Sequence, residues 1–288
     1  MINITILTAM HGRPLIGEIF ASHCKSIQSL APDWCRLEIF AAISDEENKA
    51  VCERHGIDYV MTDNLPLGRK WNTGLDWALS TFRKTDYVLI LGSDDLISTR
   101  IFGADFRKAM EDKVDYFGVQ KVYFYDIETD KARMFEYINS RLIGAGRFVS
   151  IRAIKTAGML VTVRFKTSYD LPDFKVNAGD YRFISKDAAI YYQTLRICQQ
   201  YGGPRVMLWD DDINVYLDGS SEMRLVRAGF LPVAIPTEFP IVVDLKTSDN
   251  LHSFNEIARF GDEVDTAKCL EFLSPEIRDA IHSLSIKV

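Results

Sequence analysis

The first third of the chain alternates between short apolar runs and longer amphipathic stretches. The apolar runs, which predict strands, occupy residues 2–8, 37–43, 57–61 and 87–91. The stretches between them predict helices, at residues 14–30, 45–55 and 70–82. This β-α-β-α-β-α-β order predicts an α/β fold, a mostly parallel sheet with helices on both faces, because parallel strands need crossover connections.

The pattern is less regular after residue 98. Phe102, Phe106 and Met110 recur at a spacing of four and predict a helix over 98–112. Aromatic and β-branched residues predict a strand over 116–125. Later helices are predicted at residues 186–200, 218–228 and 275–284. No shift in composition marks a boundary, so we expect one domain over 1–288 with an irregular C-terminal half.

Composition narrows the class of protein. The chain has 288 residues, 47% of them hydrophobic and 26% charged, as in an ordinary globular protein. It has no basic leader at the N-terminus, and no apolar run approaches the roughly 20 residues of a membrane span. Five scattered cysteines without C-x-x-C spacing favour reduced thiols and a cytoplasmic location. The net charge of −6 gives no general attraction to nucleic acid or anionic membranes.

The strongest chemical signal is the segment Y-V-L-I-L-G-S-D-D, Tyr87 to Asp95, where an apolar run ends in two adjacent carboxylates. Ligands of parallel sheets bind at the carboxyl ends of the strands. Asp94 and Asp95 would stand there as hard oxygen donors, which suit Mg²⁺ or Mn²⁺ bridging a diphosphate. The alternative is that one of them only caps the following helix.

Three earlier motifs lie at the ends of predicted strands or open predicted helices. They read T-A-M-H-G-R-P-L (8–15), A-I-S-D-E-E (42–47) and N-L-P-L-G-R-K-W-N-T-G-L (64–75). In the first, the N-terminus of the following helix offers free N–H groups to an anion, and Arg13 could add charge for phosphate. In the second, Asp45 could cap a helix with Glu47 as its capping partner.

Together these motifs resemble the GT-A fold nucleotide-diphospho-sugar transferases, particularly the inverting family 2 glycosyltransferases. The resemblance covers residues 2–125 and resumes at 143–158 and 217–235. It implies metal-dependent transfer of a sugar from a nucleoside-diphosphate donor to a hydroxyl acceptor. It also implies a nucleotide-sugar-binding half, 1–125, and an acceptor-binding half, 126–288. The donor-binding residues that it implies are Thr8, Met10, Arg13, Asp45, Gly68, Lys70, Asn72 and Asp94. Asp45 stands where the family reads the nucleobase, which suits a UDP-type donor.

The metal motif departs from the family pattern. The usual motif has three acids, D-x-D-D, and Gly92 stands at the first of them. Asp94 would then touch ribose and Asp95 the metal, Mn²⁺ or Mg²⁺. His252 could be a further ligand, as a late histidine is in some members, or an ordinary surface histidine.

The general base falls in one of two registers. The family places a Glu-Asp pair, an arginine and a glycine here, and Asp218, Arg224 and Gly229 match all but the glutamate, which is Leu217. A competing register uses W-D-D-D, Trp209 to Asp212, with Asp211 as the base and Asp210 or Asp212 as other options. We favour Asp218, although it could also cap a helix with Ser221 and Glu222. Upstream, residues 144–158 resemble the strand and helix that line the sugar pocket.

Two other functions stay open: a non-catalytic sugar-nucleotide-binding module and a nucleotidyltransferase. The chain has no P-loop, no dinucleotide-binding motif after its first strand and no G-x-S-x-G elbow. The acceptor could be a saccharide, a protein or a hydroxylated nucleic-acid base. The last would need a basic groove with aromatic residues, and the tyrosines that could serve are Tyr169, Tyr181, Tyr191, Tyr192 and Tyr201.

Overall fold

The computed structural model describes most of the chain. The described residues are 1–137, 141–158, 162–164, 169–171, 174–176, 181–183, 207–211, 213–214, 217–248, 250, 254–257 and 261–285. The helix predicted at 186–200 therefore lies outside the described residues, as do the five tyrosines considered for a nucleic-acid base, apart from the backbone of Tyr169 and Tyr181.

The N-terminal half follows the predicted order. The elements are β1 (Ile2–Met10), α1 (Pro14–Ser29), β2 (Cys35–Ile43), α2 (Glu46–His55), β3 (Asp58–Met61), α3 (Leu67–Thr81) and β4 (Tyr87–Ile90). The strands are rich in apolar residues, and each helix begins near a predicted start, with Pro14 in the first turn of α1 and Asp45 capping α2. The predicted alternation of strands and helices is confirmed.

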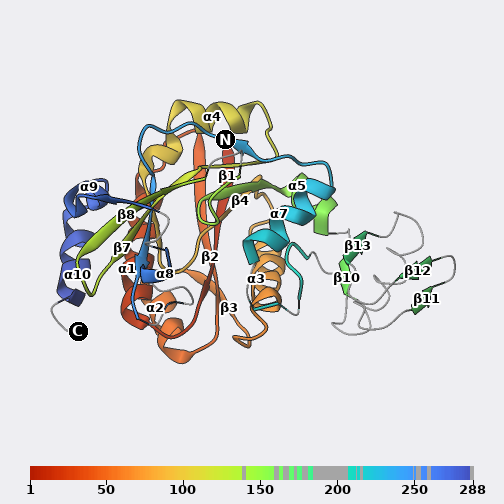
Figure 1. Ribbon diagram of the computed structural model, residues 1–288, viewed down its shortest axis with the longest axis horizontal. Coiled ribbons are helices and arrows are strands. Elements are labelled where there is room, and N and C mark those ends of the chain that lie inside the picture. Colours follow the sequence, from red (N-terminus) through yellow and green to blue (C-terminus); the bar gives the residue numbers. More distant parts are fainter. Residues whose placement is uncertain are drawn as a thin grey trace.

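Seven strands form a central sheet in the order β14-β6-β9-β4-β1-β2-β3. Figure 1 labels four of them, β1, β2, β3 and β4. The strands not yet introduced are β6 (Tyr116–Gly118), β9 (Arg147–Ser150) and β14 (Val233–Ala234). All neighbours pair in parallel except β9, which runs antiparallel to both β4 and β6. The predicted fold class, a mostly parallel sheet with helices around it, is confirmed.

Helices cover both faces of the central sheet. Ile4 and Ile6 of β1 pack with residues of α1 and α2, whereas Leu7 packs with residues of α3, α5 (Ile151–Gly158) and α7 (Leu217–Arg227). Alternate residues of one strand point to opposite faces, so a strand covered on both sides must be apolar throughout. This explains why β4, which is buried along its whole length, reads as a continuous apolar run.

A second sheet stands beside the first, in the order β16-β8-β7-β15-β5. Its strands are β5 (Asp95–Ile97), β7 (Lys121–Asp126), β8 (Lys131–Glu136), β15 (Val242–Lys246) and β16 (Asp262–Val264). The prediction of one strand over 116–125 is wrong, because the chain leaves the central sheet after Gly118 and joins the second sheet at Lys121. The two segments have similar composition but pair with different partners.

The helix predicted over 98–112 is divided. A 3-10 turn, η1 (Thr99–Phe102), precedes α4 (Ala104–Glu111), and Gly103 between them has an extended backbone that interrupts the helix. The predicted helices at 218–228 and 275–284 are confirmed as α7 and α10 (Pro275–Ser285). The chain also contains α8 (Phe254–Ile257) and α9 (Thr266–Leu270), and the two-stranded pairs β10 (Thr162–Arg164) with β13 (Tyr181–Phe183) and β11 (Tyr169–Leu171) with β12 (Phe174–Val176). None of the helices in the described ranges is long and apolar enough to cross a membrane.

Candidate functional site

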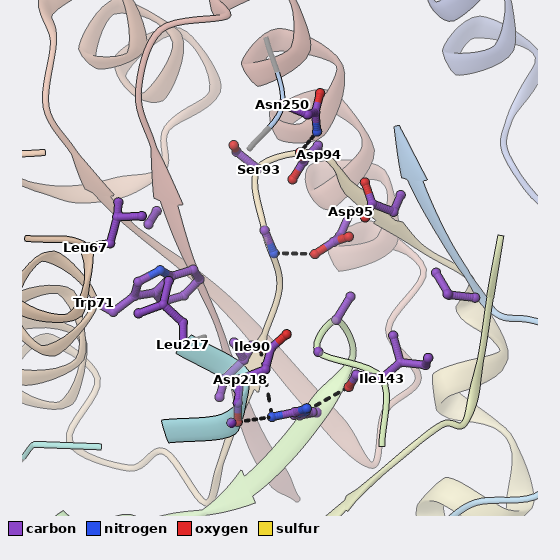
Figure 2. A pocket seen from close by; sticks show the side chains of 18 of the residues that line it. Leu67, Trp71, Ile90, Ser93, Asp94, Asp95, Ile143, Leu217, Asp218 and Asn250 are labelled. Atoms are coloured by element: carbon purple, nitrogen blue, oxygen red, sulfur yellow. Dashed lines mark hydrogen bonds and ion pairs between the residues drawn. The ribbon is translucent and has the colours of Figure 1, made fainter. Parts of the chain in front are cut away.

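A cavity of about 900 Å³ opens where the two sheets meet. Its walls come from the loops after β1 and β4, the start of α3, the second sheet, the segment before β9 and the first turns of α7. Figure 2 shows Asp94 and Asp95 in one part of this cavity and Asp218 beside Leu217 in another. A volume of this size is at the upper end of the range for ligand pockets, and the position at the strand ends is the one expected for an α/β protein.

Three carboxylates meet at one end of the cavity. Asp94 and Asp95 follow β4, and Asp244 comes from β15, where it pairs with Asp95 across the antiparallel β5–β15 ladder. One oxygen from each of the three lies within 4.8 Å of the other two. The Oδ1 atom of Asp244 is buried and accepts no hydrogen bond from the described residues. The motif analysis found the first two acids and missed Asp244.

The glycine that interrupts the acidic motif has a spatial reason. A Cβ at Gly92 would lie 2.7 Å from Oδ1 of Asp94 and 2.8 Å from Oδ2 of Asp95. The Gly92 N–H also donates to Oδ2 of Asp95 at 2.5 Å. A third acid at position 92 would displace the other two. The third carboxylate, Asp244, comes instead from β15. The sequence signal that could have indicated it is an Asp within the otherwise mostly apolar strand V-V-D-L-K.

Burial and neighbouring charges shift the pKa values of Asp95 and Asp244 upward. Burial, and then the charges of Asp244 and Asp94, raise the pKa of Asp95 well above its usual range. Burial also raises the pKa of Asp244 to about 7, opposed by Lys246, whose Nζ lies 2.7 Å from Oδ2 of Asp244. Buried like charges destabilise the charged form of each carboxylate. A bound cation would relieve this repulsion.

Arg13 reaches the acids from the loop after β1. Its guanidinium donates to Oδ2 of Asp94 at 3.0 Å, and Nδ2 of Asn250 donates to the same oxygen at 2.7 Å. Gly12 and Arg13 both have positive φ, 56° and 47°, so the loop turns sharply in the left-handed region just before α1. The strained loop is held from behind by α2.

Asp45 is part of that support. Its carboxylate caps α2 by accepting from the Asn48 N–H at 2.7 Å, and it accepts from the Gly12 N–H at 3.0 Å. Burial acts to raise the pKa of Asp45, but these hydrogen bonds and nearby His11 outweigh it and hold the pKa below its usual value. Asp45 does not line the cavity in the structure, whereas His11 does.

Lys70 of α3 lines the cavity next to the end of β1. Its side chain is 1% exposed, and Nζ donates to the carbonyl of Met10 at 2.6 Å and to Oδ1 of Asn64 at 3.0 Å. Burial lowers the pKa of Lys70 to about 8, although Asp45 acts to raise it. Met10 and Thr8 belong to β1 and are buried behind the cavity wall.

Gly68 and Asn72 of α3 contact the segment 207–211, which includes Asp211. A Cβ at Gly68 would lie 1.8 Å from the carbonyl oxygen of Asp210, so the glycine serves a close approach of the protein's own backbone. Nδ2 of Asn72 donates to Oδ1 of Asp211 and to the carbonyl of Trp209. None of these three residues lines the cavity that the described residues enclose. Asp210 is turned away as well and accepts from Arg224 at 2.5 Å.

Asp218 projects into the cavity from the first turn of α7, with 62% of its side chain exposed. Arg147 of β9, 4% exposed, donates to the carbonyls of Asp218, Ile143 and Leu142 and so fixes the helix start against the preceding loop. Glu222, one turn further along α7, lies 3.5 Å from the same guanidinium. Gly144 faces Asp218, because a Cβ there would lie 2.0 Å from Oδ2 of Asp218.

The structure thus brings Arg13, Lys70, Asp94, Asp95 and Asp218 around one cavity, together with Arg147, Glu222, Asp244, Lys246 and Asn250, for which the sequence analysis proposed no role at the site. His252 and Asp212 lie outside the described residues. Within those residues, Cys24, Cys35, Cys52 and Cys269 are free and buried. Burial raises the pKa of the Cys35 thiol to about 11 and that of Cys52 to about 12, so neither is a thiolate at neutral pH.

No family model and no curated protein matches the chain. Solved structures do match. TarS of S. aureus is 12% identical over 54% of this chain and 48% of its own, with a TM-score of 0.35. Drosophila β-1,4-galactosyltransferase 7, solved with manganese, UDP-Gal and xylobiose, is 9% identical over 92% of this chain and 82% of its own, with a TM-score of 0.46. CMP:2-keto-3-deoxy-manno-octonic acid synthetase with CTP is 13% identical over 99% of this chain and 100% of its own, with a TM-score of 0.38.

The TM-scores of these matches, 0.35 to 0.46, are too low for them to carry an argument about this chain. The match covers about half of the TarS chain, 48%. Identities of 9 to 13% carry no information on activity or substrate. The function must therefore be argued from the site itself.

Proposed function

We propose that the protein transfers a sugar from a nucleoside-diphosphate donor to a hydroxyl acceptor, with inversion and with a divalent cation. The observation that carries the proposal is the arrangement of one cavity. A cluster of three acids with adjacent cationic side chains lies in one part of it, and an exposed carboxylate, Asp218, lies in another. The first suits a diphosphate with its metal, and the second suits an acceptor hydroxyl.

The acidic cluster fits a cation of the Mg²⁺ or Mn²⁺ type. Its donors are carboxylate oxygens, the ligands that such hard cations prefer. The buried Oδ1 of Asp244 accepts no hydrogen bond in the described part of the chain, so it is available to coordinate a cation. We assign Asp95 and Asp244 as ligands, with Asp94 beside them. When bound, the cation would neutralise charge on the diphosphate.

Three basic side chains complete the donor side. Arg13 and Lys246 are paired with acids of the cluster and could turn to phosphate oxygens that enter beside those acids. Lys70 adds a third charge beneath the loop after β1. The UDP-type donor expected from Asp45 has less support, because both oxygens of that carboxylate already accept hydrogen bonds from Gly12 and Asn48.

Asp218 is the proposed general base. The acceptor oxygen would attack the anomeric carbon and give its proton to Asp218, while the bond from that carbon to the diphosphate oxygen breaks and its electron pair leaves with the diphosphate. A single displacement of this kind inverts the anomeric configuration. The alternative base, Asp211, has 15% of its side chain exposed and is turned toward α3, with Asn72 donating to it and Arg69 lying 3.6 Å away.

The test combines binding with turnover. Thermal melts with UDP-, CDP- and GDP-sugars, with and without Mn²⁺, should show a larger stabilisation when donor and cation are present together, because both bind only the folded state. Asp95→Asn and Asp218→Asn should each abolish product formation in the folded protein, whereas Asp105→Asn, an exposed acid on α4, should retain it. Wild-type turnover in either of the first two variants would refute the assigned role.

Two outcomes would replace the proposal rather than refine it. Donor binding without hydrolysis or transfer under any condition would identify a sugar-nucleotide-binding module. Release of pyrophosphate from a nucleoside triphosphate in the presence of a sugar acid or sugar phosphate would identify a nucleotidyltransferase.

A further inference from the structure

The second sheet presents three aromatic rings to the cavity. Phe124 lies on β7, Phe135 on β8 and Tyr137 directly after β8, and all three line the cavity. The rings of Phe124 and Phe135 are 6.4 Å apart, and those of Phe135 and Tyr137 are 4.9 Å apart in an edge-to-face arrangement. We call these three residues the aromatic strip. Each ring is only partly buried, although aromatic side chains gain most from complete burial.

The strip begins next to the acidic cluster. In the register of the second sheet, Asp244 pairs with Asp95 on one side and with Phe124 on the other. Residues paired in this way point to the same face of a sheet. Lys246, bonded to Asp244, also lies over the Phe124 ring, with Nζ 5.4 Å from the ring centroid. A molecule lying on the strip would therefore be adjacent to the proposed leaving group.

The strip ends at the carboxylates of α7. Arg141 lies over the Tyr137 ring, 5.7 Å from its centroid, and within 3.8 Å of Glu222. Glu222 and Asp218 are one helical turn apart, and both face Arg147, at 3.5 and 3.9 Å. The strip thus leads from the acidic cluster to a polar edge made of two guanidiniums and two carboxylates.

This combination matches the two sides of a sugar ring. The C–H face of a pyranose is apolar and packs on an aromatic ring, whereas its rim of hydroxyls needs donors and acceptors such as guanidinium and carboxylate groups. A nucleic acid fits less well, because it requires an excess of positive charge for its phosphates. Among the described residues at this end of the cavity the charges balance instead, since Arg141 and Arg147 face Glu222 and Asp218.

We propose that the acceptor is a saccharide and that it binds on the aromatic strip, with its hydroxyls on Arg141 and Glu222 and the reacting hydroxyl at Asp218. The identification of this molecule as an acceptor rests on the proposed function, whereas the binding of a saccharide ring to the strip does not. Glu222 then serves as an acceptor-binding residue, a role that no sequence motif indicated.

The experiment measures binding of free saccharides by saturation-transfer NMR on the full-length protein. The probes are cellobiose, lactose, maltose and xylobiose, with 5-hydroxymethyl-2′-deoxycytidine and a serine-rich peptide as competing acceptor classes. We expect transfer to the ring protons of at least one disaccharide and to neither competitor. Tyr137→Leu and Phe135→Leu, which keep apolar volume but remove the π face, should each weaken that binding about fivefold or more. Trp77→Leu removes an aromatic ring that is 55% exposed on α3, outside the cavity, and should leave binding unchanged.

The outcomes separate this inference from the function on which it builds. Three results would overturn it, even if a nucleotide sugar stabilises the protein. They are that no disaccharide binds, that Tyr137→Leu and Phe135→Leu bind the disaccharide as well as the wild type does, or that the protein prefers the nucleoside or the peptide. Saccharide binding that is lost in both leucine variants would support it. If no nucleotide sugar binds in the same samples, the saccharide site stands and the transferase proposal fails.

Discussion

Asn72 offers the sharpest test of how the cavity wall is built, because its side chain makes four hydrogen bonds inside the protein. Nδ2 donates to the carbonyl of Trp209 at 2.8 Å and to Oδ1 of Asp211 at 2.9 Å. Oδ1 accepts from the N–H groups of Leu208 and Trp209 at 2.9 and 3.1 Å. Asn72 itself is 0% exposed, so water cannot replace it without entering the core.

The expected magnitude follows from the groups that lose their partner. Asn72→Ala leaves buried backbone groups of Leu208 and Trp209 unsatisfied, each at about 1 to 3 kcal/mol. Since such terms are not fully additive, we expect the free energy of unfolding to fall by about 3 kcal/mol or more. At about 2 to 4 °C per kcal/mol for a chain somewhat smaller than this one, the melting temperature should fall by roughly 6 to 12 °C.

Two companion variants sharpen the test. The melting temperature and the urea midpoint are measured for all three variants. Asn72→Asp keeps the shape but turns the donor into an oxygen facing the Trp209 carbonyl and the Asp211 carboxylate, so it should be at least as destabilising as alanine. Asn214→Ala removes an exposed hydrogen bond to the Leu67 N–H and should change stability by about 1 kcal/mol or less. An Asn72→Ala protein with unchanged stability but no donor binding would refute this reasoning and restore the direct contact that the motif implied.

Three further outcomes follow from burial, space and charge. Because burial lowers the pKa of Lys70 from 10.5 to about 8, the unfolded state binds more protons between these pH values. As the pH rises through this window, the free energy of unfolding of the wild type should therefore increase relative to that of Lys70→Met, by up to about 3 kcal/mol. Urea titrations at several pH values measure it, and parallel curves for the two proteins would contradict the reasoning. Gly144→Ala should displace Asp218, lowering kcat with little change in melting temperature. Gly219→Ala, whose Cβ meets no atom of the described residues within 4 Å, should behave as wild type. Equal kcat values in the two variants would show that the contact is unimportant. Asp95→Asn removes a carboxyl group whose charged form is disfavoured by burial and by the neighbouring acids, so its melting temperature in EDTA should exceed that of the wild type. The Mn²⁺-induced increase should disappear, and a retained increase would place the cation elsewhere.

The position of the candidate site was predictable because the residues that first indicated it are close together in the sequence. Asp94 and Asp95 follow an apolar run, and the carboxyl end of such a strand is where an α/β protein binds ligands. Arg13, in the loop after β1, was predicted from the helix start that follows it, and its guanidinium contacts Asp94. Single strands and loops of this kind are recognisable from the residues beside them.

Other residues in the motifs turned out to support the wall rather than to face the cavity. Asp45 caps α2 and holds Gly12, which the capping alternative anticipated in part. Gly68 and Asn72 are positioned by the segment 207–211, which is far away in the sequence. A motif states that a residue is needed at a place, but the direction of its side chain depends on what packs against it.

The sequence by itself determined the order of strands and helices through α3 and β4, because hydrophobic periodicity is a local property of the chain. Only the tertiary structure decided that β15 pairs with both β5 and β7 and so sets Asp244 between Asp95 and Phe124. The same holds for the division of 116–125 between two sheets. Strand pairing joins residues more than a hundred positions apart, and the pattern within a strand does not specify which distant strand completes its hydrogen bonds.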